Sequence, residues 1–99
     1  MAKVVAAQRA RSDLTRLIAT HNLPDDTRDR VRRSLSQLET FPLAGGRLAG
    51  RWRGFRVILG PWPWMLLVYQ YDEGTDTVVV DAIHDARTAS AVQAGQPRR

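Results

Sequence analysis

Cysteine is absent from this chain of 99 residues, which excludes disulfide bonds, thiolate catalysis and cysteine-based zinc sites. Histidine is scarce: only His21 and His84 occur, far apart in the sequence, and they give no basis for predicting a metal site. No apolar run approaches the roughly 20 residues of a membrane-spanning helix, and the first residues lack the pattern of a secretory signal. These absences predict a cytoplasmic protein with no membrane partner, no metal and no other cofactor.

Lysine is nearly missing too, because Lys3 is the only lysine among 15 basic residues. Part of this arginine bias is what a GC-rich genome would produce by itself. Physically, however, the guanidinium group is a planar fork that pairs with phosphate and stacks on bases. With 10 acidic residues the formal net charge is +5, which favours a polyanion as partner: a nucleic acid, a nucleoprotein or an acidic protein.

The length predicts one domain, which we place at residues 1–91, while residues 92–99 have no periodicity and are predicted to form a flexible tail. Residues 3–6 are rich in valine and predict a short first strand. Apolar residues at helical spacing follow from Ala10, with Asp13 on the polar side of the predicted helix. This helix should end at residues 21–24, because Asn22 tolerates a left-handed C-cap and Pro24 cannot continue a helix.

A second helix is predicted directly afterwards, with Asp25 or Asp26 as N-cap and an apolar stripe formed by Val31, Leu35 and Leu38. It ends at residues 41–42, and the short link between the two helices predicts an antiparallel hairpin. Residues 43–50 are rich in glycine but lack the spacing of a phosphate-binding loop, so we interpret them as a connector.

From residue 51 the apolar pattern has a period of two, which predicts three antiparallel strands at residues 51–59, 64–71 and 77–83. The middle one is apolar on both faces and is predicted to be central, with Tyr69 in the core. Asp81 shares a face with apolar neighbours, so it needs a place at an edge or an arginine partner. The fold class is therefore α+β: a short N-terminal strand and an antiparallel two-helix hairpin packed on an antiparallel sheet, in the order β-α-α-β-β-β.

Three segments carry a resemblance to a known family: Leu-x-x-Phe-Pro at residues 38–42, LAGRWRGFRVILG at 48–60 and WMLLVYQYDEGTDTVVVDAIHDAR at 64–87. With the length and element order, they resemble the RelE/ParE superfamily of toxins from type II toxin–antitoxin systems, over the chain to about residue 90. The family usually has a strand ending in Val/Ile-Tyr, an acidic turn and a valine-rich strand that closes on basic residues.

The resemblance implies a toxin held inactive by a small cognate antitoxin protein. RelE-like members cut mRNA on the ribosome, whereas ParE-like members poison DNA gyrase, so the implied targets are the ribosome with its mRNA or, alternatively, DNA gyrase. A third alternative is a toxin relative that has lost its activity and serves as an interaction protein.

Metal-free RNA cleavage requires a proton acceptor for the 2′-hydroxyl, cations for the phosphate and a proton donor for the leaving oxygen. RelE-like enzymes supply these groups from basic residues on the sheet, and the resemblance implies the following catalytic candidates here: Arg53, Arg56, His84 and Arg87. The candidate nucleic-acid-binding residues are Arg51, Arg53, Arg56, Trp62 and Arg87. His84 would carry protons, and Trp62 would stack on a base.

Each candidate also has a structural interpretation. Arginines on an edge strand deter aggregation, a lone histidine at a strand end is often a hydrogen-bonded surface residue, and Arg87 can form a salt bridge with Asp85. Two departures weaken the nuclease interpretation: Met65 stands where RelE-like proteins commonly have an arginine, and TASAV at residues 88–92 lacks the tyrosine that often follows the last strand. Both departures favour an inhibitor that acts by binding.

Overall fold

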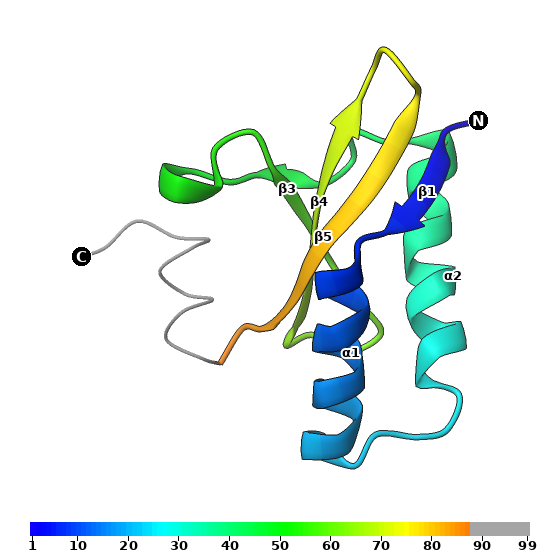
Figure 1. Cartoon of the computed structure of the whole chain (residues 1–99), viewed down its shortest axis with the longest axis vertical. Coiled ribbons are helices and arrows are strands. Elements are labelled where there is room, and N and C mark those ends of the chain that lie inside the picture. The colour runs from blue at the N-terminus through cyan, green and yellow to red at the C-terminus, as the bar shows by residue number, and fades with distance from the viewer. Residues whose placement is uncertain (88–99) are drawn as a thin grey trace.

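The computed structural model describes residues 1–87 (Figure 1). Its elements are β1 (Lys3–Ala6), α1 (Gln8–His21), α2 (Thr27–Thr40), β2 (Gly46–Arg47), a 3₁₀ turn (Gly50–Trp52), β3 (Arg56–Leu59), β4 (Met65–Asp72) and β5 (Thr77–Asp85). The predicted α+β class is confirmed. The predicted tail at residues 92–99 lies outside the described residues, as does the TASAV segment. Neither helix of the described part is long and apolar enough to cross a membrane.

The two helices lie side by side and run antiparallel, as their short connection predicts (Figure 1). Asn22 adopts the left-handed conformation, with φ 51° and ψ 51°, and its backbone N–H reaches the carbonyl of Ile18, so the predicted C-cap is confirmed. Asp26 occupies the N-cap of α2, but its carboxylate makes no capping hydrogen bond. It accepts a hydrogen bond from Arg30 instead, at 3.0 Å.

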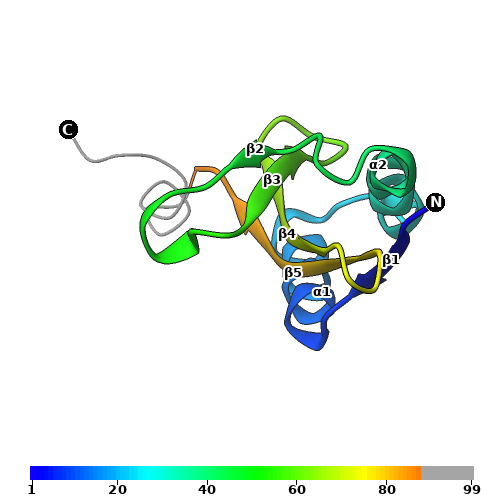
Figure 2. The ribbon, with the colours of Figure 1, turned by 90° about the horizontal axis from the view of Figure 1, so that it is seen from above.

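The sheet has five strands in the order β1-β5-β4-β3-β2, and only part of it matches the prediction of an antiparallel sheet. Strands β2 to β5 are antiparallel to their neighbours, whereas β1 pairs with β5 in parallel. A parallel pair requires a long crossover between its strands. Here the crossover is all of the chain from α1 to β4, so the sheet is mixed. Seen from above, α1 lies below β5, on the side away from the β2–β3 hairpin (Figure 2).

The predicted strand at residues 51–59 is too long, because regular strand structure begins only at Arg56. Gly50 and Gly54 have φ angles of 65° and 92°, in the region that favours glycine, and they shape the turn between them. Arg51 and Arg53 therefore lie in a loop rather than on a strand. The predicted connector at residues 43–50 also contains a short strand, β2, which pairs with β3.

The main core lies between the helices and the sheet, and Tyr69 on β4 is fully buried in it, as predicted. The Tyr69 hydroxyl accepts a hydrogen bond from the backbone N–H of Gly45 at 2.9 Å. A Cβ atom at residue 45 would lie 2.7 Å from that hydroxyl oxygen, so only glycine fits here. Burial raises the pKa of the Tyr69 hydroxyl, which stays a neutral hydrogen-bonding group. This contact fixes the connector against the central strand.

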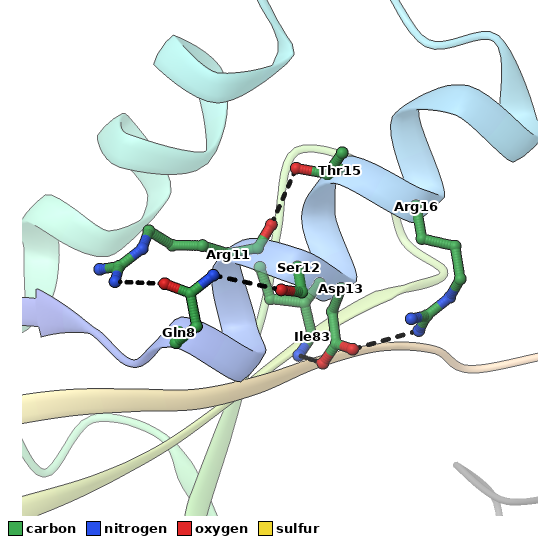
Figure 3. A network of polar contacts seen from close by, with 7 residues as sticks. All are labelled: Gln8, Arg11, Ser12, Asp13, Thr15, Arg16 and Ile83. Atoms are coloured by element: carbon green, nitrogen blue, oxygen red, sulfur yellow. Dashed lines mark hydrogen bonds and ion pairs between the residues drawn. The ribbon is translucent and has the colours of Figure 1, made fainter.

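The exposed edge of β5 is completed by a side chain of α1. Strand β1 pairs with β5 only as far as Val80, and α1 starts directly after β1. Asp13 is 7% exposed, contrary to its predicted place on the polar side of the helix. Its Oδ2 accepts a hydrogen bond from the backbone N–H of Ile83 at 3.0 Å, and Arg16 donates to its Oδ1 at 3.1 Å (Figure 3). Asp13 thus takes the place of the missing strand.

A β-bulge resolves the conflict predicted at Asp81. Tyr69 pairs with Val80 and Val68 pairs with Ala82, so Asp81 is an extra residue in β5. The bulge shifts the alternation of buried residues, which leaves Asp81 half-buried while its neighbours on both sides are buried. Asp81 also lies directly after Val80, the last residue of β5 that pairs with β1, which agrees with the first of the two predicted solutions, a place at an edge.

We expect the Asp13→Ala substitution to destabilise the protein by about 1–3 kcal/mol, because it leaves the buried N–H of Ile83 without an acceptor. Urea denaturation of both proteins measures this difference. Asp29→Ala is the matched control, since it removes the exposed Asp29–Arg32 pair and should cost less than about 1 kcal/mol. Equal losses in the two variants would contradict the role of Asp13 at the strand edge.

Candidate functional site

The β2–β3 hairpin carries a groove of about 530 Å³ that we call the arginine groove. Three arginines line it: Arg47 from β2, Arg53 from the loop and Arg56 from β3. The other lining residues are Leu48, Ala49, Gly50, Gly54 and Phe55, none of which is acidic. The hairpin therefore concentrates guanidinium groups that no neighbouring carboxylate in the groove neutralises.

The arginines of the hairpin differ in how firmly the protein holds them. Arg56 is half-buried and donates hydrogen bonds to the carbonyl oxygens of Leu43 and Gly45, at 3.2 and 2.8 Å, so it ties β3 to the connector. Arg47, Arg51 and Arg53 are exposed, and within residues 1–87 their side chains make no hydrogen bond or ion pair. Their N–H donors are available to a ligand.

His84 lies beneath the loop that precedes β3. Its ring meets that of Trp52 edge to face at 5.6 Å, and Trp52 in turn contacts Phe55 at 5.2 Å. The Nε2 atom of His84 is buried and has no hydrogen-bond partner within the described part of the chain. Burial lowers the pKa of His84, nearby Asp13 opposes that effect, and Arg9 reinforces it. His84 is therefore half-buried, with the Trp52 ring packed against it.

Arg87 is engaged at the end of β5 in the ion pair that the sequence suggests. Its Nε and Nη2 donate to Oδ1 and Oδ2 of Asp85, at 2.9 and 2.8 Å, and its backbone N–H also donates to Oδ1. Asp85 is 8% exposed and also lies 3.2 Å from Nε2 of His21 on α1. The hydrogen bond from Arg87 lowers the pKa of Asp85 to about 2, against the opposing effect of burial.

Two tryptophans, Trp62 and Trp64, pack beside the group formed by His21, Asp85 and Arg87. The Trp64 ring lies 4.8 Å from the His21 ring and 4.6 Å from the Arg87 guanidinium. Trp62 stacks on Trp64 at 6.1 Å and has Arg30 at 5.7 Å. Both rings pack against the core. Trp62, predicted to stack on a base, already contacts an aromatic ring and a guanidinium group of its own chain.

The structure divides the predicted site residues between two places. Arg53 and Arg56 line the arginine groove, and Arg51 lies in the same loop, whereas Arg87 is not among the residues that line it. Arg56 pairs with Tyr69 of β4, but Asp85 pairs with Met65, four residues or about 13 Å further along β4. The catalytic set inferred from the resemblance is therefore not gathered around one point.

Sequence reasoning missed Arg47 and His21. Arg47 stands in a glycine-rich stretch, and its only signal was that GGRLAGRWRGFR can form a hairpin with arginines on both arms. His21 ends α1, where a cation suits the helix dipole, but no feature of the sequence connects it with Asp85.

Solved structures with this arrangement include toxins of toxin–antitoxin pairs, although no protein-family model and no curated protein matches the chain. A variant of the E. coli toxin RelE, bound to a peptide of its antitoxin RelB, superposes with a TM-score of 0.65 at 19% identity, over 93% of this chain and 90% of RelE. The chain has the RelE-type fold.

Two further structures agree with this fold. The RelBE2 toxin–antitoxin complex from Mycobacterium tuberculosis gives a TM-score of 0.58 at 23% identity, over 85% of this chain and 96% of that chain. A metal-bound toxin from Helicobacter pylori gives 0.64 at 24% identity, over 86% of this chain and 94% of that one. In residues 1–87 of the present protein, no three His, Asp or Glu side chains gather to hold a metal ion.

The buried Asp85 carboxylate should make stability depend on acid pH. Its pKa lies below the ordinary value of 3.8, at about 2, so its contribution is fully present above pH 3.8 and disappears as the pH falls towards 2. We expect Asp85→Asn to be less stable than the wild type near neutral pH, with the difference shrinking over that acid range. Urea denaturation at a series of pH values measures it; a difference that does not change with pH would contradict the assignment.

Proposed function

We propose that this protein is the toxin of a type II toxin–antitoxin system, which inhibits growth by cleaving mRNA on the ribosome and is neutralised by a small antitoxin protein. The observation that supports this proposal is the arginine groove on a RelE-type fold. The solved structures with this fold include toxins bound to their antitoxins, and the excess of basic residues suits a ribonucleoprotein target.

The arginine groove has the chemistry that binding of an RNA backbone requires. Arg47 and Arg53 offer unoccupied N–H donors, which can bind phosphate oxygens bidentately. Arg56 keeps the hairpin in place by its two hydrogen bonds to the connector and adds a third positive charge. Binding to RNA by such contacts weakens as the salt concentration rises.

A second candidate function is inhibition of DNA gyrase by binding without catalysis. Met65, which stands where RelE-like proteins commonly have an arginine, is fully buried in the core and cannot touch a substrate. Arg87 is paired with Asp85 rather than free. Both observations favour a toxin that acts by occupying a protein surface.

The nuclease proposal predicts breaks in cellular transcripts when the protein is produced without an antitoxin. Mapping of transcript 5′ ends after induction should reveal cuts aligned with codons, and the double substitution of Arg47 and Arg53 by alanine should reduce cutting by about 100-fold, because two charge-assisted contacts to the RNA backbone are lost, each worth about 1.5–3 kcal/mol. Arg33→Ala, an exposed arginine on α2, is the matched control and should leave cutting intact. Intact transcripts in growth-arrested cells would end the proposal.

The gyrase alternative makes a separate prediction. Purified protein at micromolar concentration should inhibit the supercoiling of plasmid DNA by gyrase. Full gyrase activity in the presence of the protein would exclude this candidate, whatever the outcome of transcript mapping.

A further inference from the structure

A second cavity lies between the C-terminal half of α1 and the end of β5, away from the arginine groove. It has a volume of about 410 Å³ and is lined by Arg16, Leu17, Thr20 and His21 from α1 and by Ile83, His84 and Asp85 from β5. We propose that RNA cleavage takes place here, with His21 as the proton acceptor and the Asp85 carboxylate orienting it. This inference rests on the proposed ribonuclease function and adds a catalytic residue to it.

The hydrogen bond to Asp85 determines which nitrogen of His21 can act as a base. An ionised carboxylate only accepts hydrogen bonds, so the Nε2 atom, 3.2 Å from Oδ2 of Asp85, carries the proton in the neutral imidazole. The lone pair is then on Nδ1. Within residues 1–87, Nδ1 makes no hydrogen bond. The side chain of His21 is 28% exposed, so a ligand in the cavity can reach the ring.

The orientation of the His21 ring is held from two sides. Asp85 binds its Nε2 edge, and Trp64 packs against the ring at 4.8 Å. Asp85 is held in turn by the two hydrogen bonds from the Arg87 guanidinium. Such layered support keeps a catalytic side chain in a productive geometry before the substrate arrives.

Two guanidinium groups near the histidine can bind the phosphate: Arg16 lines the cavity, whereas Arg87 does not line it but binds the same Oδ2 atom of Asp85 as His21 does. The side chains of Arg16 and Arg87 are 63% and 57% exposed, and each uses only part of its donor set on a carboxylate. Arg16 donates to Asp13 through Nη2 alone, and Arg87 leaves Nη1 unused in its pair with Asp85. A guanidinium group has five N–H donors, so both retain donors for phosphate oxygens.

The reaction can be written with these groups and water. The Nδ1 atom of His21 accepts the proton of the 2′-hydroxyl as its oxygen attacks the phosphorus. The new P–O2′ bond forms while the P–O5′ bond breaks, which yields a 2′,3′-cyclic phosphate. The departing 5′ oxygen takes a proton from water, and His21 then releases its own proton to the solvent.

The decisive experiment uses the full chain in a reconstituted translation reaction, with ribosomes on a defined mRNA and primer extension to measure cleavage. His21→Gln places an amide N–H near the position of Nε2, so it can keep the hydrogen bond to Asp85 while removing the base. We expect the cleavage rate to fall by about 100-fold or more, the range for loss of a general base. Arg33→Ala should cleave like the wild type.

The variant also separates a catalytic from a structural role. The wild-type rate should rise with pH and reach a plateau, since a histidine base works only in its neutral form, and His21→Gln should lose that rise. The charged and titratable groups around His21 are Arg16, His84, Asp85 and Arg87. His84 remains in the variant, so a rise that persists there would assign the titration to His84 and overturn the role of His21.

Two more variants, His21→Ala and Asp85→Asn, test the base and its orientation separately. His21→Ala should be inactive and should regain activity when free imidazole is added, an effect that repair of packing cannot mimic. Asp85→Asn can donate to Nε2 and so favours the tautomer with its proton on Nδ1, which should lower the maximal rate without raising the ribosome concentration needed for half-maximal rate. Absence of imidazole rescue, or an unchanged maximal rate in Asp85→Asn, would contradict the mechanism.

The outcomes distinguish the inference from the proposed function. If the wild type cleaves and His21→Gln cleaves within about threefold of it, far less than the loss expected for a general base, the role of His21 is wrong and the ribonuclease proposal stands. If the wild type does not cleave mRNA on the ribosome, the proposed function fails and this inference fails with it.

Discussion

The hydrogen bond between the Asp13 carboxylate and the backbone N–H of Ile83 is the contact on which the arrangement of this molecule depends. It completes the edge of β5 beyond the last residue paired with β1, and it does so from the middle of a helix. α1 is thereby attached to β5 at Ile83, and its last turn lies beside the end of that strand. His21 meets Asp85 as a direct consequence.

Three glycines, Gly45, Gly50 and Gly54, determine the position of the β2–β3 hairpin at the other end of the sheet. Gly45 lets the connector approach Tyr69 closely, and Gly50 and Gly54 allow the chain to turn before β3. The arginines between and beside them are therefore carried on a short hairpin instead of on a long edge strand. Three guanidinium groups face one groove because the hairpin folds back, which a straight strand with alternating faces could not achieve.

The two basic clusters differ in physical character. In the arginine groove, Arg47 and Arg53 are exposed and unpaired within the described residues, so their positive charges and N–H donors are available to bind a polyanion. At the end of β5, the positive charge of Arg87 is tied to a buried carboxylate and to the face of Trp64. The first cluster suits binding of a long backbone, and the second suits the precise orientation of a few atoms.

Local pattern in the sequence determined the helices, the central strand and the left-handed cap at Asn22, because periodicity and capping depend on residues a few positions apart. It could not determine that Asp13 is buried, that β1 runs parallel to β5 or that a bulge occurs at Asp81. These features depend on pairing between distant strands. The candidate site divides in the same way: the arginines around residue 53 were visible as a local cluster, whereas the His21–Asp85 pair, separated by most of the chain, arises only from the packing of α1 against β5.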